Sequence, residues 1–445
     1  MGVSDFSTGM AGSDDRGQYL RPVRRAQAVA LAGVLLASCG PEVAESIGSA
    51  TASTTTNAST DGWMGGSGST TVVDTSAPTT GPDGPYVYKE EVVELEAPPP
   101  RGVFSLEALP GGRALVIGGL ALDGPDAGKD PDVVTGTLLW RREDGFVAGP
   151  ELLQPRFEHD SAALSDGSVL VFSGRSTREP EPKILDVERI DFAGLGSEVI
   201  GALTEERRDI IAIAEPGDTV VVLGDSFMVA ERFDPSTGMS TPLPVELEFP
   251  FVSAFLAPVF SAAWRGNGEL VVLGGINGSS DAAWHVQGPQ VIDMDDNSSR
   301  PIGADAGAGT DFRRQALTLP DGSVLLLGNP GHSGLPGPWL MRLDAATDTL
   351  TALQELADPK MAFNHTPVGV VLADGRVWIV GEPGSDPGVA THFYDPTSDA
   401  LTPGPSLPTP TFPVAAVLLD TGPVLLLGGS ENPYVDPSLA AFLLE

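Results

Sequence analysis

The residues of this chain that could do chemistry are few and scattered. It has five histidines in 445 residues, and one of them closes the sequence Arg156-Phe-Glu-His159. The chain also contains a repeated pattern of about 50 residues. Four other polar residues occupy similar positions in other copies of this pattern: Arg208, Asp209, Arg314 and His365. If the repeats are arranged in a ring, these residues lie together around one rim of its central channel. There they can bind a polar ligand or move a proton. The commoner use is to hydrogen-bond one part of the fold to another. These six residues are therefore candidate ligand-binding residues, and no catalytic residue or metal ligand is assigned.

Two short motifs imitate the active sites of hydrolases. The segment from Val220 to Ser226 resembles the start of a GDS-type esterase, with Ser226 as nucleophile. Such an enzyme needs an Asp-x-x-His pair to activate the serine, and the sequence has none. His159, Asp160 and Ser161 are consecutive, so a strand would point them to opposite faces and they cannot form a triad. Both motifs are interpreted as structural.

A third motif has part of the spacing of a calcium-binding loop. Asp293, Asp295 and Asn297 occupy alternate positions, as the first ligands of such a loop do. The sixth position is Ser298 where glycine is needed, and the twelfth is Ala304 where a bidentate glutamate belongs. The segment is therefore interpreted as a turn between strands.

The elements that must position these residues follow a repeat. Seven segments share an apolar stretch, a glycine-containing turn and a second apolar stretch rich in β-branched residues. The turn glycines are Gly112, Gly167, Gly217, Gly268, Gly322, Gly375 and Gly422, with spacings of 55, 50, 51, 54, 53 and 47 residues. Turns such as Asp-Gly tolerate positive φ and suit tight hairpins. A second turn follows in several units, at residues 233–238, 294–299, 343–348 and 394–399. Each unit is therefore expected to form four antiparallel strands.

A hairpin that recurs about every 50 residues resembles the kelch repeat, in which each unit is one blade of a β-propeller. The resemblance covers residues 86–445 and implies an all-β, seven-bladed kelch-type propeller. The sequence does not distinguish a true kelch propeller from a galactose-oxidase-like propeller of the same superfamily. A copper-radical oxidase of that type would need a cysteine cross-linked to a tyrosine, plus two histidines. The only cysteine, Cys39, precedes the propeller, so no copper and no other cofactor is expected.

The two ends of the repeat predict how the ring closes. After the seventh hairpin, residues 438–444 can form one more strand, and the fourth strand of that blade is missing. Residues 86–96 precede the first hairpin and can supply it. Pairing these segments would remove two exposed sheet edges. We therefore expect the last blade to be closed by an N-terminal strand.

The first 38 residues have the features of a bacterial signal peptide. Arg21, Arg24 and Arg25 precede an apolar run, 26–37, that is too short to span a bilayer. The run ends in Leu-Ala-Ser-Cys39, which resembles a lipobox, and this resemblance implies that Cys39 is the lipid attachment site. An ordinary signal peptide with a chance cysteine is the alternative. Translation could start at Met1 or Met10.

Residues 39–85 are rich in Ser, Thr and Gly and contain too little apolar surface to fold by themselves. They predict a disordered linker between the lipidated cysteine and the propeller. The expected location is the bacterial cell envelope, at the outer membrane or cell surface, with the membrane contacted through the lipid anchor.

The composition of the chain limits the classes of partner that it can bind. The chain has 25 Lys+Arg against 60 Asp+Glu, a formal net charge of −35. Such a surface repels phosphate backbones, so nucleic acid is excluded as a partner. The favoured function is a membrane-anchored binding module for an unidentified protein or glycan. The alternative is a carbohydrate-active enzyme, of the sugar isomerase or oxidoreductase type, that uses the polar rim. A purely architectural role in the envelope stays open.

Overall fold

The computed structural model describes most of the chain after residue 83 and three short strands before it. The described residues are 54–59, 67–72, 80–81, 84–122, 132–177, 184–192, 196–207, 210–224, 230–245, 260–274, 276–277, 285–286, 289–302, 315–328, 338–355, 367–381, 390–429 and 439–445. The chain divides after Gly48 into two units, and every described residue belongs to the second, Ser49–Glu445. Among these residues there is no helix.

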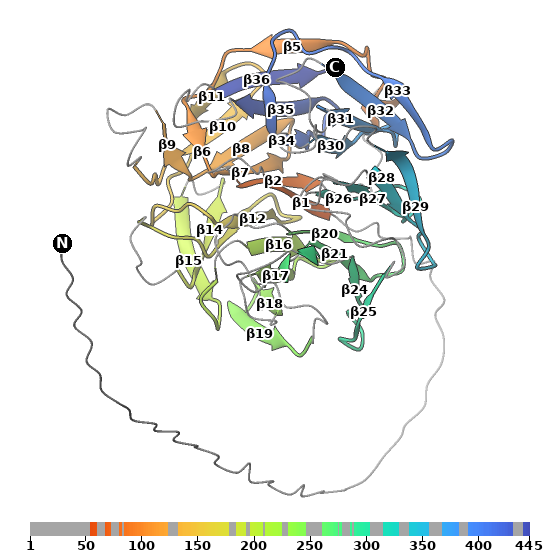
Figure 1. Cartoon of the computed structure of the whole chain (residues 1–445). Coiled ribbons are helices and arrows are strands. Elements are labelled where there is room, and N and C mark those ends of the chain that lie inside the picture. The colour runs from red at the N-terminus through yellow and green to blue at the C-terminus, as the bar shows by residue number, and fades with distance from the viewer. Residues whose placement is uncertain are drawn as a thin grey trace, which may run out of the picture. The chain divides into compact units, whose positions relative to one another are not determined.

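Seven blades, each of four antiparallel strands, make up the propeller (Figure 1), and the sheet of blade 1 contains two further strands, 54–59 and 67–72. Blade 1 contains β7 (Ser105–Leu109), β8 (Arg113–Ile117), β10 (Thr137–Arg141) and β11 (Gly145–Ala148). Blade 2 contains β12 (Asp160–Ala163), β13 (Val169–Phe172), β14 (Asp186–Asp191) and β15 (Gly196–Ala202). Blade 3 contains β16 (Ile210–Ala214), β17 (Val220–Gly224), β18 (Ala230–Asp234) and β19 (Met239–Leu243). Blade 4 contains β20 (Phe260–Trp264), β21 (Leu270–Gly274), β24 (Gln290–Ile292) and β25 (Ser299–Pro301).

The other three blades follow the same order. Blade 5 contains β26 (Gln315–Thr318), β27 (Val324–Leu327), β28 (Pro338–Leu343) and β29 (Leu350–Glu355). Blade 6 contains β30 (Val368–Val371), β31 (Val377–Val380), β32 (Thr391–Asp395) and β33 (Ala400–Pro403). Blade 7 contains β34 (Phe412–Leu418), β35 (Val424–Gly429), β36 (Leu439–Leu444) and β5 (Val92–Leu95). Two small sheets pair β6 (Arg101–Gly102) with β9 (Leu120–Ala121), and β22 (Ile276–Asn277) with β23 (His285–Val286).

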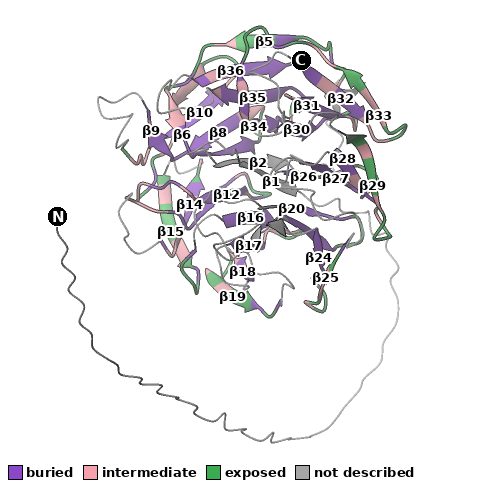
Figure 2. Cartoon of the chain, in the orientation of Figure 1, coloured by how far each residue is buried: buried purple, intermediate pink, exposed green. Residues whose placement is uncertain are grey.

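The apolar stretches of the repeat form the core between blades. Seven clusters of buried side chains each join two neighbouring blades. In one of them, Leu170 and Phe172 of blade 2 pack with Val220 and Val222 of blade 3. The second strand of each blade is apolar on both faces because both faces are covered. Burial decreases from the inner strands to the outer ones (Figure 2).

The two ends of each blade differ in loop length. Short turns join the first and second strands at residues 110–112, 164–168, 215–219, 265–269, 319–323, 372–376 and 419–423. Neighbouring turns touch around the ring: Ser165 N donates to Asp218 Oδ1 at 2.8 Å, and Gly266 N donates to Gly322 O at 2.8 Å. We call this end the short-turn face. The opposite end, where the second strand meets the third and one blade meets the next, is the long-loop face.

The predicted seven-bladed ring and its closure are confirmed. β5 pairs antiparallel with β36, and Val93 lies opposite Leu443. In Figure 1 the orange β5 lies along the blue β36. The approach to β5 is fixed by Tyr88, whose hydroxyl donates to Gly422 O at 2.7 Å and accepts from Ala373 N at 3.1 Å. The first and last parts of the propeller therefore share one sheet.

The segment predicted to be a linker contains four strands, which the sequence analysis did not expect. These are β1 (Thr54–Ser59), β2 (Ser67–Val72), β3 (Thr80–Gly81) and β4 (Gly84–Pro85). β1 and β2 form a hairpin among the inner strands, at the centre of the ring in Figure 1. The hairpin has few apolar residues of its own, and inner strands of the blades surround it. Elsewhere in residues 39–85 the chain lies outside the described residues, and the linker stays a prediction there.

Candidate functional site

Two of the six candidate ligand-binding residues, Arg156 and His159, lie in the part of the chain that the structure describes. The other four, together with Cys39 and Ser226, lie outside the described residues, so their assignments stay predictions. Arg156 and His159 belong to the segment that enters the first strand of blade 2 from the long-loop face. Their contacts show which role this position of the repeat has in blade 2.

Arg156 is fully buried and all its contacts are within the protein. Its Nε and Nη2 donate to Oε1 of Glu188, at 3.1 and 2.6 Å, and both side chains have no exposed surface. Its Nη1 donates to the carbonyl oxygens of Ser173 and Asp186, at 2.9 and 3.0 Å. Burial lowers the pKa of Arg156, while Glu188 acts in the opposite direction. The guanidinium therefore fastens the entry of blade 2 to the third strand of the same blade.

Blade 3 repeats this arrangement with Arg207. Its Nε and Nη2 donate to Oε1 of Glu231, at 3.1 and 2.7 Å. Burial opposes ionisation of Glu231, but hydrogen bonds from Ser240, the Thr204 amide and Arg207 outweigh it and lower its pKa. The equivalent of Arg156 is therefore Arg207, the residue before the predicted Arg208.

The signal for this correspondence was present in the sequence. Arg156 and Arg207 each stand four residues after a leucine, and each partner glutamate precedes an arginine in the third strand. Each glutamate also accepts two backbone amides of the entering segment, those of residues 153 and 154 in blade 2 and of 204 and 205 in blade 3. Breaking such a buried pair leaves an uncompensated charge and costs about 3–5 kcal/mol.

His159, Asp160 and Ser161 point to alternate sides, as the sequence analysis predicted. Asp160 Oδ2 accepts from the Ala212 amide of blade 3 at 2.7 Å. His159 and Ser161 face blade 1 instead, where His159 Nε2 lies 3.1 Å from Ser105 Oγ. Burial, followed by the charge of Arg156, lowers the pKa of His159 to about 3. The imidazole is therefore neutral.

Glu107, on the inner strand of blade 1, is a buried acid that the sequence analysis missed. Its Oε1 lies 2.7 Å from Ser161 Oγ, which lies 2.8 Å from Ser105 Oγ. Its Oε2 has no hydrogen-bond partner in the described structure. Burial raises the pKa of Glu107 well above its ordinary value, and the nearby charge of Asp160 adds to this effect. Burial therefore favours the neutral carboxyl group, and a chain of hydrogen bonds runs from Glu107 through Ser161 and Ser105 to His159.

This cluster is peculiar to the interface between blades 1 and 2. Strand pairing aligns Glu107 with the apolar residues Ala162, Ile213, Ala263, Leu317, Val370 and Val417 of the other blades. A buried ionisable group with a strongly shifted pKa is a candidate for function. Here the group is fully buried at a blade interface, so the arrangement can hold a proton.

Other polar residues of the inner strands join neighbouring blades. Ser261 Oγ of blade 4 accepts from the Ala316 amide of blade 5 at 3.0 Å. Gln315 of blade 5 bonds both backbone groups of Gly369 of blade 6, at 2.7 and 2.9 Å. Asp160, at the equivalent position of its strand, accepts the Ala212 amide of blade 3. Comparing this position across the repeats would have revealed these contacts.

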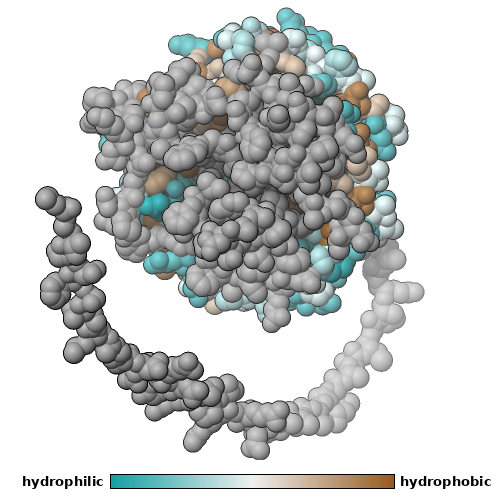
Figure 3. All heavy atoms as spheres, viewed as in Figure 1, coloured by the Kyte–Doolittle hydropathy of each residue, from teal (hydrophilic) through white to brown (hydrophobic). Residues whose placement is uncertain are grey.

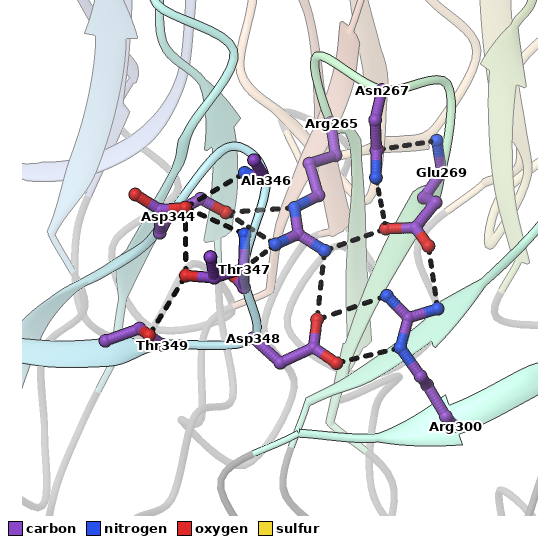
Figure 4. Close-up of polar contacts among 9 residues, drawn as sticks. All are labelled: Arg265, Asn267, Glu269, Arg300, Asp344, Ala346, Thr347, Asp348 and Thr349. Atoms are coloured by element: carbon purple, nitrogen blue, oxygen red, sulfur yellow. Dashed lines mark hydrogen bonds and ion pairs between the residues drawn. The ribbon is translucent and has the colours of Figure 1, made fainter.

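On the short-turn face, charged side chains form ion pairs and hydrogen bonds with other groups of the protein, as blades 4 and 5 show (Figure 4). Arg265, whose side chain is buried, donates to Glu269 Oε2 at 2.7 Å and to Asp348 Oδ1 at 3.1 Å. It also donates to the carbonyl oxygen of Asp344. Arg300 bridges the same two carboxylates, and its hydrogen bonds are the main cause of a lowered pKa at Asp348. This network clamps the turns of two blades together.

The calcium-like motif is a turn, as predicted. It joins β24 to β25, and Asp293 Oδ1 accepts the Asp295 amide at 2.9 Å. Among the described residues, no three His, Cys, Asp or Glu side chains are placed to hold a metal ion. The same residues contain no helix that is long and apolar enough to cross a membrane.

Comparison with known proteins supports the fold. No family model and no curated protein matches the sequence. Among solved structures, the chain is similar to a fungal alcohol oxidase of the AA5 family in complex with copper, with a TM-score of 0.53 and 16% identity. The match covers 80% of this chain and 75% of the oxidase. The protein is thus a seven-bladed β-propeller. At this identity the likeness concerns the fold alone.

Proposed function

We propose that this protein is a membrane-anchored, extracytoplasmic kelch-type propeller that binds a protein or glycan through its long-loop face. The observation that carries the proposal is the segregation of loops. The second and third strands of a blade are separated by up to 19 residues in blade 1 (118–136) and by 15 in blade 4 (275–289). Turns at the other end have three to six residues. Loops on a rigid scaffold are where binding residues concentrate.

The short-turn face is less suited to a ligand because its polar groups serve the ring. Asp420 accepts the Gly111 amide across the junction of blades 7 and 1, at 2.7 Å. Arg342 joins Asp321 to Asp399 across blades 5 and 6. A ligand there would compete with contacts that hold blades together. The outer edge in Figure 3 is mostly hydrophilic with smaller hydrophobic areas, in keeping with the net charge of −35.

The described residues offer no group of metal-binding side chains for copper chemistry like that of the AA5 oxidase. Cys39 precedes the propeller, and the two described histidine side chains, His159 and His392, belong to blades 2 and 6. The sugar-enzyme alternative relied on the polar rim of six residues, of which the structure describes Arg156 and His159. Both are buried with protein partners, so the described residues give this alternative no support.

The anchor is proposed from Cys39 and the apolar run before it. It is tested by expressing the full chain in a bacterium supplied with a labelled fatty acid. We expect label in the protein and sedimentation with membranes, and loss of both in Cys39→Ser. An unlabelled wild-type chain in the soluble fraction would refute the anchor.

The binding face is tested with two exposed apolar residues, one near each end of the blades. Leu153, 56% exposed, lies on the long-loop face, and Met239, 65% exposed, starts a strand beside a short turn. In the Cys39→Ser background, each is changed to cysteine and coupled to a bulky polyethylene glycol. Glycan arrays and cell-envelope fractions are then screened for binding.

We expect a ligand for the uncoupled protein, loss of binding with the polymer at position 153, and binding retained with it at position 239. Binding that is blocked only from position 239 would contradict the choice of face. No ligand above background on either screen would contradict the binding function.

A further inference from the structure

The hairpin β1–β2 lies at the centre of the propeller. Its strands pair from Thr54 opposite Val72 to Ser59 opposite Ser67. β1 lies beside the inner strands β16, β20, β26 and β34, and β2 lies beside β7, β12 and β34. Six of the seven blades thus contribute an inner strand to its surroundings. The hairpin occupies the channel around which the blades are arranged (Figure 1).

The direction of the hairpin follows from one pairing. β2 is parallel to β7, with Thr70 opposite Leu106. β7 runs from the long-loop face to the short turn at residues 110–112. β2 therefore ends, and β1 begins, at the short-turn face. The chain enters the channel there at Thr54 and leaves it there after Val72.

The next described contacts agree with this direction. Tyr88 bonds Gly422 and Ala373, which belong to the short turns of blades 7 and 6. β5 then starts at the same face, because it is antiparallel to β36. Both the entry to the channel and the approach to the last blade are therefore at the short-turn face.

We propose that the hairpin turns the short-turn face toward the membrane and presents the long-loop face to the outside. This inference rests on the proposed anchor at Cys39. Only residues 40–53, fourteen in number, separate that cysteine from the channel entrance. Fourteen residues span at most about 50 Å when extended, and as a coil they average about 20 Å.

A linker without the hairpin would act differently. Residues 40–85 would all be free, and 46 residues of coil average about 35–40 Å. Their end would join the outermost strand of blade 7, from which either face could approach the membrane. The hairpin removes most of this freedom and makes the centre of the short-turn face the attachment point. The partner is then met at the long-loop face, away from the lipid surface.

Orientation is measured by energy transfer to the membrane. Leu153→Cys and Met239→Cys are made separately in the full lipidated chain, in which Cys39 is acylated and the new thiol alone takes a fluorescent donor. Reconstituted vesicles carry an acceptor on their lipid headgroups. We expect at least twofold greater transfer efficiency from position 239 than from position 153. A matched control with a 30-residue Gly/Ser insertion after Gly48 should remove most of the difference.

The outcomes separate the inference from the proposed function. Equal transfer from both positions, or greater transfer from position 153, in a chain that sediments with vesicles overturns the orientation and leaves the anchor intact. A chain that does not associate with vesicles refutes both. Hydrogen exchange on Cys39→Ser tests the hairpin itself: slow exchange at Thr70 supports it, and exchange at unfolded-chain rates overturns it.

Discussion

Glu107 and Glu188 are two buried glutamates that should respond oppositely to the loss of their charge. Both have no exposed surface. Glu188 is paired with Arg156 through two hydrogen bonds, whereas Glu107 contacts the hydroxyl of Ser161. Glutamine has nearly the shape of a protonated glutamate. We therefore expect Glu107→Gln to cost about 1 kcal/mol or less near pH 5, the size of one altered hydrogen bond.

The sign of the pH dependence follows from the raised pKa of Glu107. The folded state binds this proton more tightly than the unfolded chain, in which a glutamate titrates near pH 4.3. The stabilising contribution is complete below that pH and is lost as pH rises toward the folded-state pKa, by up to about 1.4 kcal/mol per pH unit. Glutamine does not titrate. The variant should therefore gain stability relative to the wild type between pH 5 and pH 8.

The assay is urea unfolding of the Cys39→Ser chain and its variants, followed by tryptophan fluorescence, at several pH values in that range. Glu188→Gln is the matched control. It leaves Arg156 without a counter-charge and should cost about 3–5 kcal/mol at every pH. The reasoning is refuted if Glu107→Gln follows the pH profile of the wild type, or if it is as destabilising as Glu188→Gln.

Two further substitutions test the contacts that join the blades. Ser261→Ala leaves the buried Ala316 amide without an acceptor and should lower the free energy of unfolding by about 1–3 kcal/mol, measured by urea unfolding; no loss would mean that the amide finds another partner. Gly422→Ala and Gly217→Ala place a Cβ at similar φ angles, +108° and +101°, but the new atom meets Tyr86 only at position 422. Gly217→Ala should cost about 1–2 kcal/mol from backbone strain and Gly422→Ala clearly more, and equal thermal midpoints would argue against the packing of Tyr86 on that turn.

The architecture could be predicted because the repeat encodes it locally. Glycines such as Gly167 and Gly322 adopt positive φ in the short turns, as the hairpin chemistry required. Blade closure could be predicted because a strand was missing at one end of the chain and present at the other. In both cases the information lies in a few adjacent residues and their spacing.

The candidate site was harder to predict because its contacts join distant segments. The partner of Arg156 is 32 residues away, and glutamates are too common for Glu188 to stand out. Glu107 has an unusual environment only because Ser161, 54 residues later, belongs to the neighbouring blade. The hairpin around Thr70 has little apolar content, and its stability comes from strands that surround it. The composition of a segment does not indicate which strands will surround it in the fold.

The most direct test of the whole account is hydrogen exchange of the blade that joins the two ends of the chain. In the Cys39→Ser protein, the amides of Val92–Leu95 should exchange slowly and together with those of Leu439–Leu444, because the two strands are paired. Slow exchange in Leu439–Leu444 with unprotected amides in Val92–Leu95 would show a ring that is not closed by its N-terminal strand, contrary to the structure.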